Sequence, residues 1–131
     1  MTFLKLPILC FVLGLVATLA PAADAPSITG SWQVHLVIGQ YDNVIVCNFT
    51  QKADALSGTC GTDNGPVVIS GTVADNKVTW TYKTFYQGNP VTPTYQGTID
   101  SSSTPTKMTG TVDVPELGAD GDFTATPAPQ Q

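Results

Sequence analysis

The chain has 131 residues, with five Lys or Arg against ten Asp or Glu, and its formal net charge is −5. This acidic balance disfavours nucleic acid and anionic membranes as partners, because a protein that binds backbone phosphates needs a basic surface. The length suits one domain built around one core.

The first residues are typical of an export signal. Lys5 supplies a positive start, residues 6–19 form an apolar run, and Ala20-Pro21-Ala22 fits a small-residue cleavage site. The apolar run is too short to favour a membrane anchor. We therefore expect residues 1–22 to be a cleaved signal peptide, and the protein to be secreted or periplasmic without membrane insertion.

The rest of the chain is typical of antiparallel strands. Short alternating runs rich in Val, Ile, Thr and Tyr are separated by Gly, Asn, Asp and Pro. After a flexible N-terminal segment at 23–27, this pattern predicts a β-barrel domain over 28–126, followed by a disordered tail at 127–131. The eight expected strands are approximately 28–38, 44–51, 56–62, 67–73, 77–86, 92–99, 107–114 and 122–126.

Five segments share one pattern: an apolar residue, any residue, Gly, Thr or Ser, then an apolar residue or Cys. Their central glycines are Gly30, Gly58, Gly71, Gly97 and Gly110. Because side chains alternate along a strand, each glycine shares a face with the apolar residues two places away. Glycines on the buried face of several strands suggest a tightly curled sheet. The sequence predicts an all-β fold, a single eight-stranded antiparallel up-and-down barrel.

A tight turn near residues 51–56 would place Cys47 directly opposite Cys60, and Phe49 opposite Gly58. These are the two cysteines that remain after signal cleavage, and an even pair in an oxidising compartment most simply forms a disulfide. We therefore predict a structural disulfide between them, with a metal site or redox chemistry as the alternatives.

The same argument extends to the next hairpins. It pairs Gly71 with Trp80, Trp80 with Gly97, and Gly97 with Gly110, so that one indole lies in a row of three glycines. It also pairs Tyr82 with Tyr95.

In an up-and-down barrel the turns at 53–55, 74–76 and 100–106 share one end, which we expect to be closed by Trp32 and Trp80. The loops at 39–43, 63–66, 87–91 and 115–121 share the opposite end, the expected mouth. The outward faces are mostly Thr, Ser, Gln and Lys, which is the reverse of an outer-membrane barrel.

The opening segment Ile28-Thr-Gly-Ser-Trp32, followed by strands that carry x-Gly-Thr, resembles the lipocalin and avidin (calycin-like) barrels. Those folds begin with a Gly-x-Trp strand whose indole closes one barrel end, and Gly30 and Trp32 match that motif. The avidin family has a biotin-binding Asn two residues after this Trp, where this chain has Val34, so biotin binding is not implied. The chain also resembles small secreted metalloprotease-inhibitor barrels in its size, its Gly-x-Trp start and its one disulfide.

Few residues suggest catalysis. His35 is the only histidine and should point outward, no paired carboxylates lie on the interior faces, and the acidic stretch 116–122 is better interpreted as a solvated turn than as a calcium loop. We therefore expect no catalytic residues, no metal and no cofactor. An enzyme stays a disfavoured alternative.

The candidate ligand-binding residues lie on the apolar interior near the mouth. Tyr82 and Tyr95 could orient a ligand with their hydroxyls, or could serve only in packing, and Thr84, Leu36 and Ile38 are further candidates. The first hypothesis is an exported binder of a small apolar molecule. The alternative is a protein-interaction module, such as a secreted protease inhibitor or an envelope-associated protein.

Overall fold

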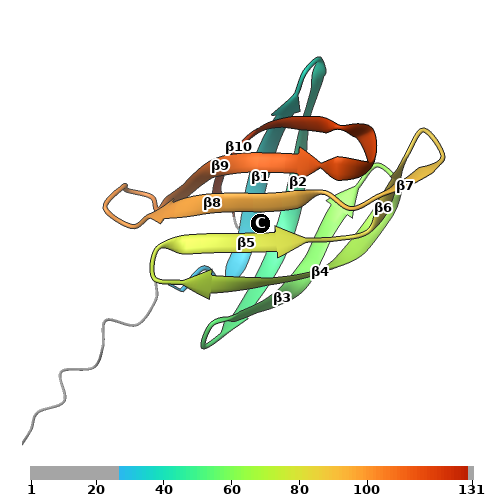
Figure 1. Ribbon diagram of the computed structural model, residues 1–131. Coiled ribbons are helices and arrows are strands. Elements are labelled where there is room, and N and C mark those ends of the chain that lie inside the picture. Colours follow the sequence, from blue (N-terminus) through green and yellow to red (C-terminus); the bar gives the residue numbers. More distant parts are fainter. Residues whose placement is uncertain (1–26, 130–131) are drawn as a thin grey trace, which may run out of the picture.

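The computed structural model describes residues 27–129 as a closed antiparallel barrel of eight strands (Figure 1). Each barrel strand pairs with its neighbours along the chain, and the first pairs with the last, which confirms the predicted fold class. The expected signal peptide lies outside the described residues, as do 23–26 and 130–131. The barrel strands are β1 (Gly30–Ile38), β2 (Tyr41–Lys52), β3 (Ala55–Thr62), β4 (Gly65–Ala74), β5 (Lys77–Thr81), β8 (Thr94–Asp100), β9 (Lys107–Val114) and β10 (Ala119–Pro127).

Alternation along the strands explains why they curl around a core. In β1 the side chains of Trp32, Val34 and Leu36 are buried, whereas Gln33 and His35 between them are exposed. Most other strands keep the same period of two, so the apolar residues gather inside and the polar residues face outward.

One expected strand, 77–86, is wrong in its second half. β5 ends at Thr81, and the chain then leaves the barrel to form a separate hairpin of β6 (Thr84–Tyr86) and β7 (Asn89–Val91) before it returns as β8. The physical reason is the two-residue turn at Gln87 and Gly88, where both residues have positive φ angles, of 50° and 81°. Turns of this kind favour a tight local hairpin over a continuing strand.

The predicted register is confirmed on three hairpins. Cys47 pairs with Cys60 and Phe49 with Gly58. The pairs Gly71–Trp80 and Gly97–Gly110 are also present.

The register between β5 and β8 differs from the expected one by two residues. Trp80 pairs with Tyr95, and Val78 pairs with Gly97, so the expected pairs Trp80–Gly97 and Tyr82–Tyr95 are wrong. A shift of two keeps every side chain on its predicted face. The inserted hairpin is the cause, because no tight turn joins β5 directly to β8.

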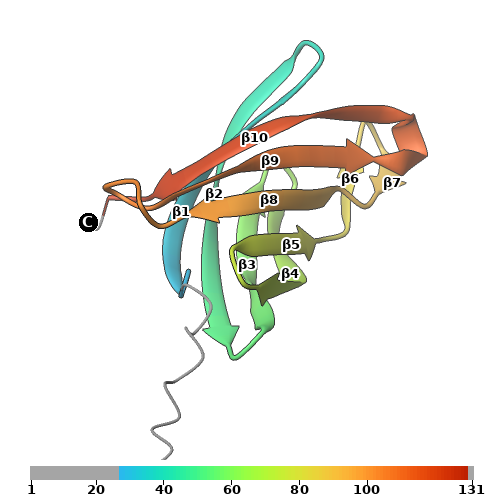
Figure 2. The ribbon, with the colours of Figure 1, turned by 60° about the vertical axis from the view of Figure 1, so that its left-hand side comes forward.

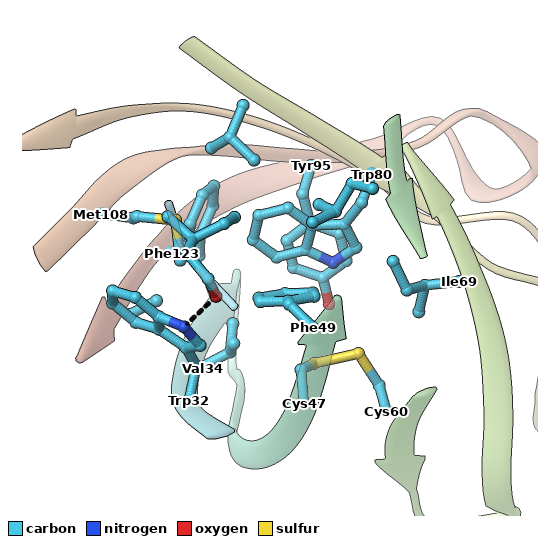
Figure 3. Packing of buried hydrophobic residues seen from close by; sticks show 14 of the residues in the cluster. Trp32, Val34, Cys47, Phe49, Cys60, Ile69, Trp80, Tyr95, Met108 and Phe123 are labelled. Atoms are coloured by element: carbon cyan, nitrogen blue, oxygen red, sulfur yellow. Dashed lines mark hydrogen bonds between the residues drawn. A yellow bond between two sulfur atoms is a disulfide. The ribbon is translucent and has the colours of Figure 1, made fainter. Parts of the chain in front are cut away.

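Trp80 lies at the centre of an aromatic cluster in the core (Figure 3). Its ring stacks on Tyr95, with centroids 4.7 Å apart and planes inclined by 8°. The rings of Phe49 and Phe123 each meet it at 5.1 Å in edge-on geometry. Within the described chain, the Trp80 indole nitrogen has no hydrogen-bond partner.

Trp32 lies beside the disulfide in the core, because it pairs with Cys47 across β1 and β2. The indole Nε1 of Trp32 donates a 2.8 Å hydrogen bond to the carbonyl oxygen of Ile28. Cys47 and Cys60 form the predicted disulfide between β2 and β3, and both are buried.

The two barrel ends differ in what connects the strands (Figure 2). The β6–β7 hairpin and the connection from β9 to β10 lie at one end, and the β8–β9 loop lies at the other. The connection from β9 to β10 contains a short 3₁₀ helix, η1 (Pro115–Leu117), which ends at Gly118. The first of these ends is the expected mouth.

Candidate functional site

A cavity of about 450 Å³ opens at the mouth of the barrel. This volume falls within the range of small-molecule sites in proteins. The residues that line it come from β1, β2, β3, β9, η1 and β10, from both strands of the β6–β7 hairpin, and from loops beside these elements.

Most of the cavity wall is apolar. Four apolar lining residues come from the barrel strands: Leu36 and Ile38 at the end of β1, Ile45 of β2 and Val114 at the end of β9. Leu36, Ile45 and Val114 are each 5% exposed or less. The wall is completed by Val91, Pro93, Leu117 and Ala119. This surface can desolvate an apolar molecule, at about 25 cal/mol for each Å² buried.

The β6–β7 hairpin forms one side of the mouth. The amide nitrogen of the Asn64 side chain donates a 2.6 Å hydrogen bond to the carbonyl oxygen of Phe85, which ties the hairpin to the β3–β4 turn. The rings of Tyr41 and Tyr86 meet edge-on with centroids 6.0 Å apart, which ties it to β2. The hairpin therefore contributes aromatic surface to the rim from outside the barrel wall.

A polar strip on one side of the rim consists of three lining residues: Tyr41, Asn43 and Asp63. The Asn43 amide donates to the Tyr41 hydroxyl at 3.1 Å, and that hydroxyl donates to the Asp63 carboxylate at 3.3 Å. Partial burial is the main cause of the raised pKa of Tyr41, and the neighbouring charge of Asp63 adds to it. The Tyr41 phenol is therefore a neutral donor at ordinary pH.

Two hydrogen-bonded tyrosines connect the cavity to the core, because Tyr82 lines the cavity and Tyr95 is buried behind it. The hydroxyls of Tyr82 and Tyr95 are 2.7 Å apart. Burial raises the pKa of Tyr82 to about 12 and raises the pKa of Tyr95 as well. Both stay neutral at physiological pH. When Tyr95 donates this hydrogen bond, the proton of the Tyr82 hydroxyl is left for a ligand or a water in the cavity.

The structure brings four of the five predicted ligand-binding residues together at this cavity: Leu36, Ile38, Tyr82 and Thr84 line it. Tyr95 does not line it, and contacts Tyr82 from within the core. The predicted end residues Trp32 and Trp80 do not line the mouth cavity and belong to the core cluster. Whether any of these residues binds a ligand stays a prediction.

Sequence reasoning missed the polar strip and the aromatic hairpin. The sequence pattern assigns no binding role to Tyr41, Asn43, Asp63 or Asn64. Their place in the expected mouth loops was the available indication.

His35 lies on the outer face of β1 and not in the cavity. Its Nε2 is 2.6 Å from a carboxylate oxygen of Asp42, and both side chains are exposed. Within residues 27–129, no group of three or more His, Cys, Asp or Glu residues could hold a metal ion. No helix in that range is both long and apolar enough to cross a membrane.

Comparisons with known proteins add nothing to this description. A scan against family models and searches of curated proteins and solved structures found no match to the chain. The fold and the site therefore define a class by geometry alone: a closed eight-stranded antiparallel barrel with one disulfide and an apolar cavity at one end.

Proposed function

We propose that this chain is an exported binding protein that takes a small, largely apolar molecule into the mouth cavity. The observation that carries the proposal is the apolar cavity of about 450 Å³ at the mouth of a barrel whose core is packed with aromatic rings. A closed barrel supports such a site well, because its wall is rigid and its loops can vary.

Two further features support export and this class of binder. The disulfide between Cys47 and Cys60 is compatible with an oxidising compartment, as the export signal predicts. The Gly30-x-Trp32 start and the up-and-down topology are what a lipocalin- or avidin-like barrel would have.

A neutral fluorescent probe, N-phenyl-1-naphthylamine, tests the proposal. We expect saturable binding of one probe per chain, and displacement of the probe by octan-1-ol. Ala119→Phe, which adds a ring at a lining position, should weaken binding at least tenfold. Ala55→Phe, at an exposed position on the other end of the barrel, should leave it unchanged.

Near-UV circular dichroism would establish that Ala119→Phe is folded. If it is not, Thr84→Phe is the substitute, because Thr84 lies on β6, outside the barrel wall. Absence of saturable binding, or equal binding by the blocked and control variants, would overturn the proposal.

The second candidate function is protein recognition through the mouth loops. It is favoured by the exposure of two large apolar side chains at the rim, Phe85 at 57% and Leu117 at 43%. Apolar residues gathered on a surface are typical of interaction sites. Recovery of a stoichiometric protein partner by a tagged chain, lost in the Phe85→Ser variant, would favour this function over small-molecule binding.

A further inference from the structure

Charged residues are divided unevenly between the two ends of the barrel. At the closed end, three lysines are matched by three aspartates: Lys52, Lys77 and Lys107 with Asp54, Asp75 and Asp100. The half that carries the mouth holds one lysine, Lys83, and six acidic residues: Asp42, Asp63, Asp113, Glu116, Asp120 and Asp122. Within residues 27–129, the excess negative charge therefore lies around the mouth.

The residues that line the cavity also carry negative and no positive charge. Asp63 is the one charged residue among the lining residues, which include no Lys, Arg or His. Its carboxylate accepts from the Tyr41 hydroxyl at 3.3 Å, and the ring of Tyr41 meets that of Tyr86. The rim thus combines one carboxylate with two electron-rich rings beside an apolar wall.

These groups distinguish between the possible charges of a ligand. An ammonium group is attracted by a carboxylate and by the faces of aromatic rings, and a mouth with an excess of negative charge concentrates cations. The same negative charge would repel a ligand with a carboxylate or phosphate group, and no cationic residue lines the cavity to offset the repulsion. A neutral head group would gain neither effect.

We propose that the ligand of the mouth cavity is an organic cation, with an ammonium group beside Asp63, Tyr41 and Tyr86 and an apolar body against the wall formed by Leu36, Ile38 and Val114. This inference rests on the proposed function, because it assigns a ligand class to the same cavity. The head group stays near solvent at the rim, where Asp63 is exposed, and the body is desolvated below it.

Three probes with one chain length separate the head-group effect from apolar burial: octylammonium, octan-1-ol and octanoate, titrated at low ionic strength. We expect octylammonium to bind about tenfold more tightly than octanoate, a ratio set by charge interactions near a solvated surface. The ratio should shrink at high salt, because exposed charges are screened.

Two variants, each lacking one negative charge, show whether Asp63 causes the preference for octylammonium. Asp63→Asn should reduce the preference for octylammonium over octanoate several-fold. Asp75→Asn, which removes one negative charge at the closed end, should retain the wild-type preference.

The outcomes separate this inference from the proposed function. Suppose that octan-1-ol binds, but octylammonium does not bind more tightly than octanoate, or Asp63→Asn keeps the preference for octylammonium. The inferred preference for a cationic ligand is then overturned, and the cavity remains a binding site. If none of the three probes binds, the proposed function fails, and this inference fails with it.

Discussion

Substitution of Gly110 by alanine should force two barrel strands apart. A Cβ atom built at this position would lie 2.0 Å from the carbonyl oxygen of Gln96 and 2.4 Å from the Cα of Gly97. Both atoms belong to the backbone of β8, which pairs with β9 at this point. Because no side chain can rotate away from the clash, relief requires movement of a strand.

The cost follows from that rigidity. Overpacking a core costs about 1–3 kcal/mol, and contact with backbone puts this site at the upper end of that range. Alanine recovers about 0.4–1 kcal/mol by restricting the unfolded chain. The net loss in the free energy of unfolding is then about 2 kcal/mol, and for a domain of this size the melting temperature should fall by about 10 °C.

Urea unfolding with the disulfide intact, followed by tryptophan fluorescence, measures this loss. Gly61→Ala is the matched control, because its added Cβ would have one non-adjacent heavy atom within 4 Å, the carbonyl oxygen of Val46 at 3.9 Å. We expect that variant to stay within about 0.5 kcal/mol of wild type, or to be slightly more stable. Equal stability of Gly110→Ala and Gly61→Ala would refute the close approach of β8 and β9.

Two further predictions concern the core. Because burial raises the pKa of Tyr82 to about 12 and raises that of Tyr95, the folded chain keeps protons above pH 10 that the unfolded chain has lost. Stability should therefore fall as pH rises from 10 to 12, by about 1.4 kcal/mol per pH unit for each tyrosine. Tyr82→Phe should have a shallower slope than wild type in denaturation midpoints measured across this range, and an unchanged slope would contradict the assignment. Replacement of Cys47 and Cys60 by alanine should cost about 3 kcal/mol in urea unfolding, and an unchanged midpoint would show that the disulfide does not stabilise the fold.

Tight turns explain why part of the barrel could be predicted residue by residue. Between β2 and β3 the turn is short, and Ala53 has a positive φ of 55°. Such a turn fixes which residues face each other, so the sequence was sufficient to pair Cys47 with Cys60 and Phe49 with Gly58.

The register of β8 could not be obtained in the same way. Residues 82–93 separate β5 from β8, and they form a hairpin of their own. No short turn then links Trp80 to a partner, and the pairing with Tyr95 is set by closure of the barrel and by stacking of the two rings. The turn at Gln87 and Gly88 was the one local indication of this hairpin.

The sequence predicts where the candidate site lies, but it does not predict the polar groups at its rim. The alternation of Leu36 and Ile38 along the first strand was enough to place them inside, near the mouth. The contact between Tyr41 and Asp63 arises because the start of β2 lies beside the end of β3. A pattern that treats each loop as separate does not show such a contact.

The most direct test of the central claim is the location of a bound small molecule. In an amide chemical-shift titration with octan-1-ol, we expect saturable shifts at Tyr41, Thr84 and Ala119 around the mouth, and no shifts at Ala55 and Ala74 at the closed end. Shifts confined to the closed end or spread over the outer faces, or the absence of saturable shifts, would contradict the claim that the mouth cavity is the binding site.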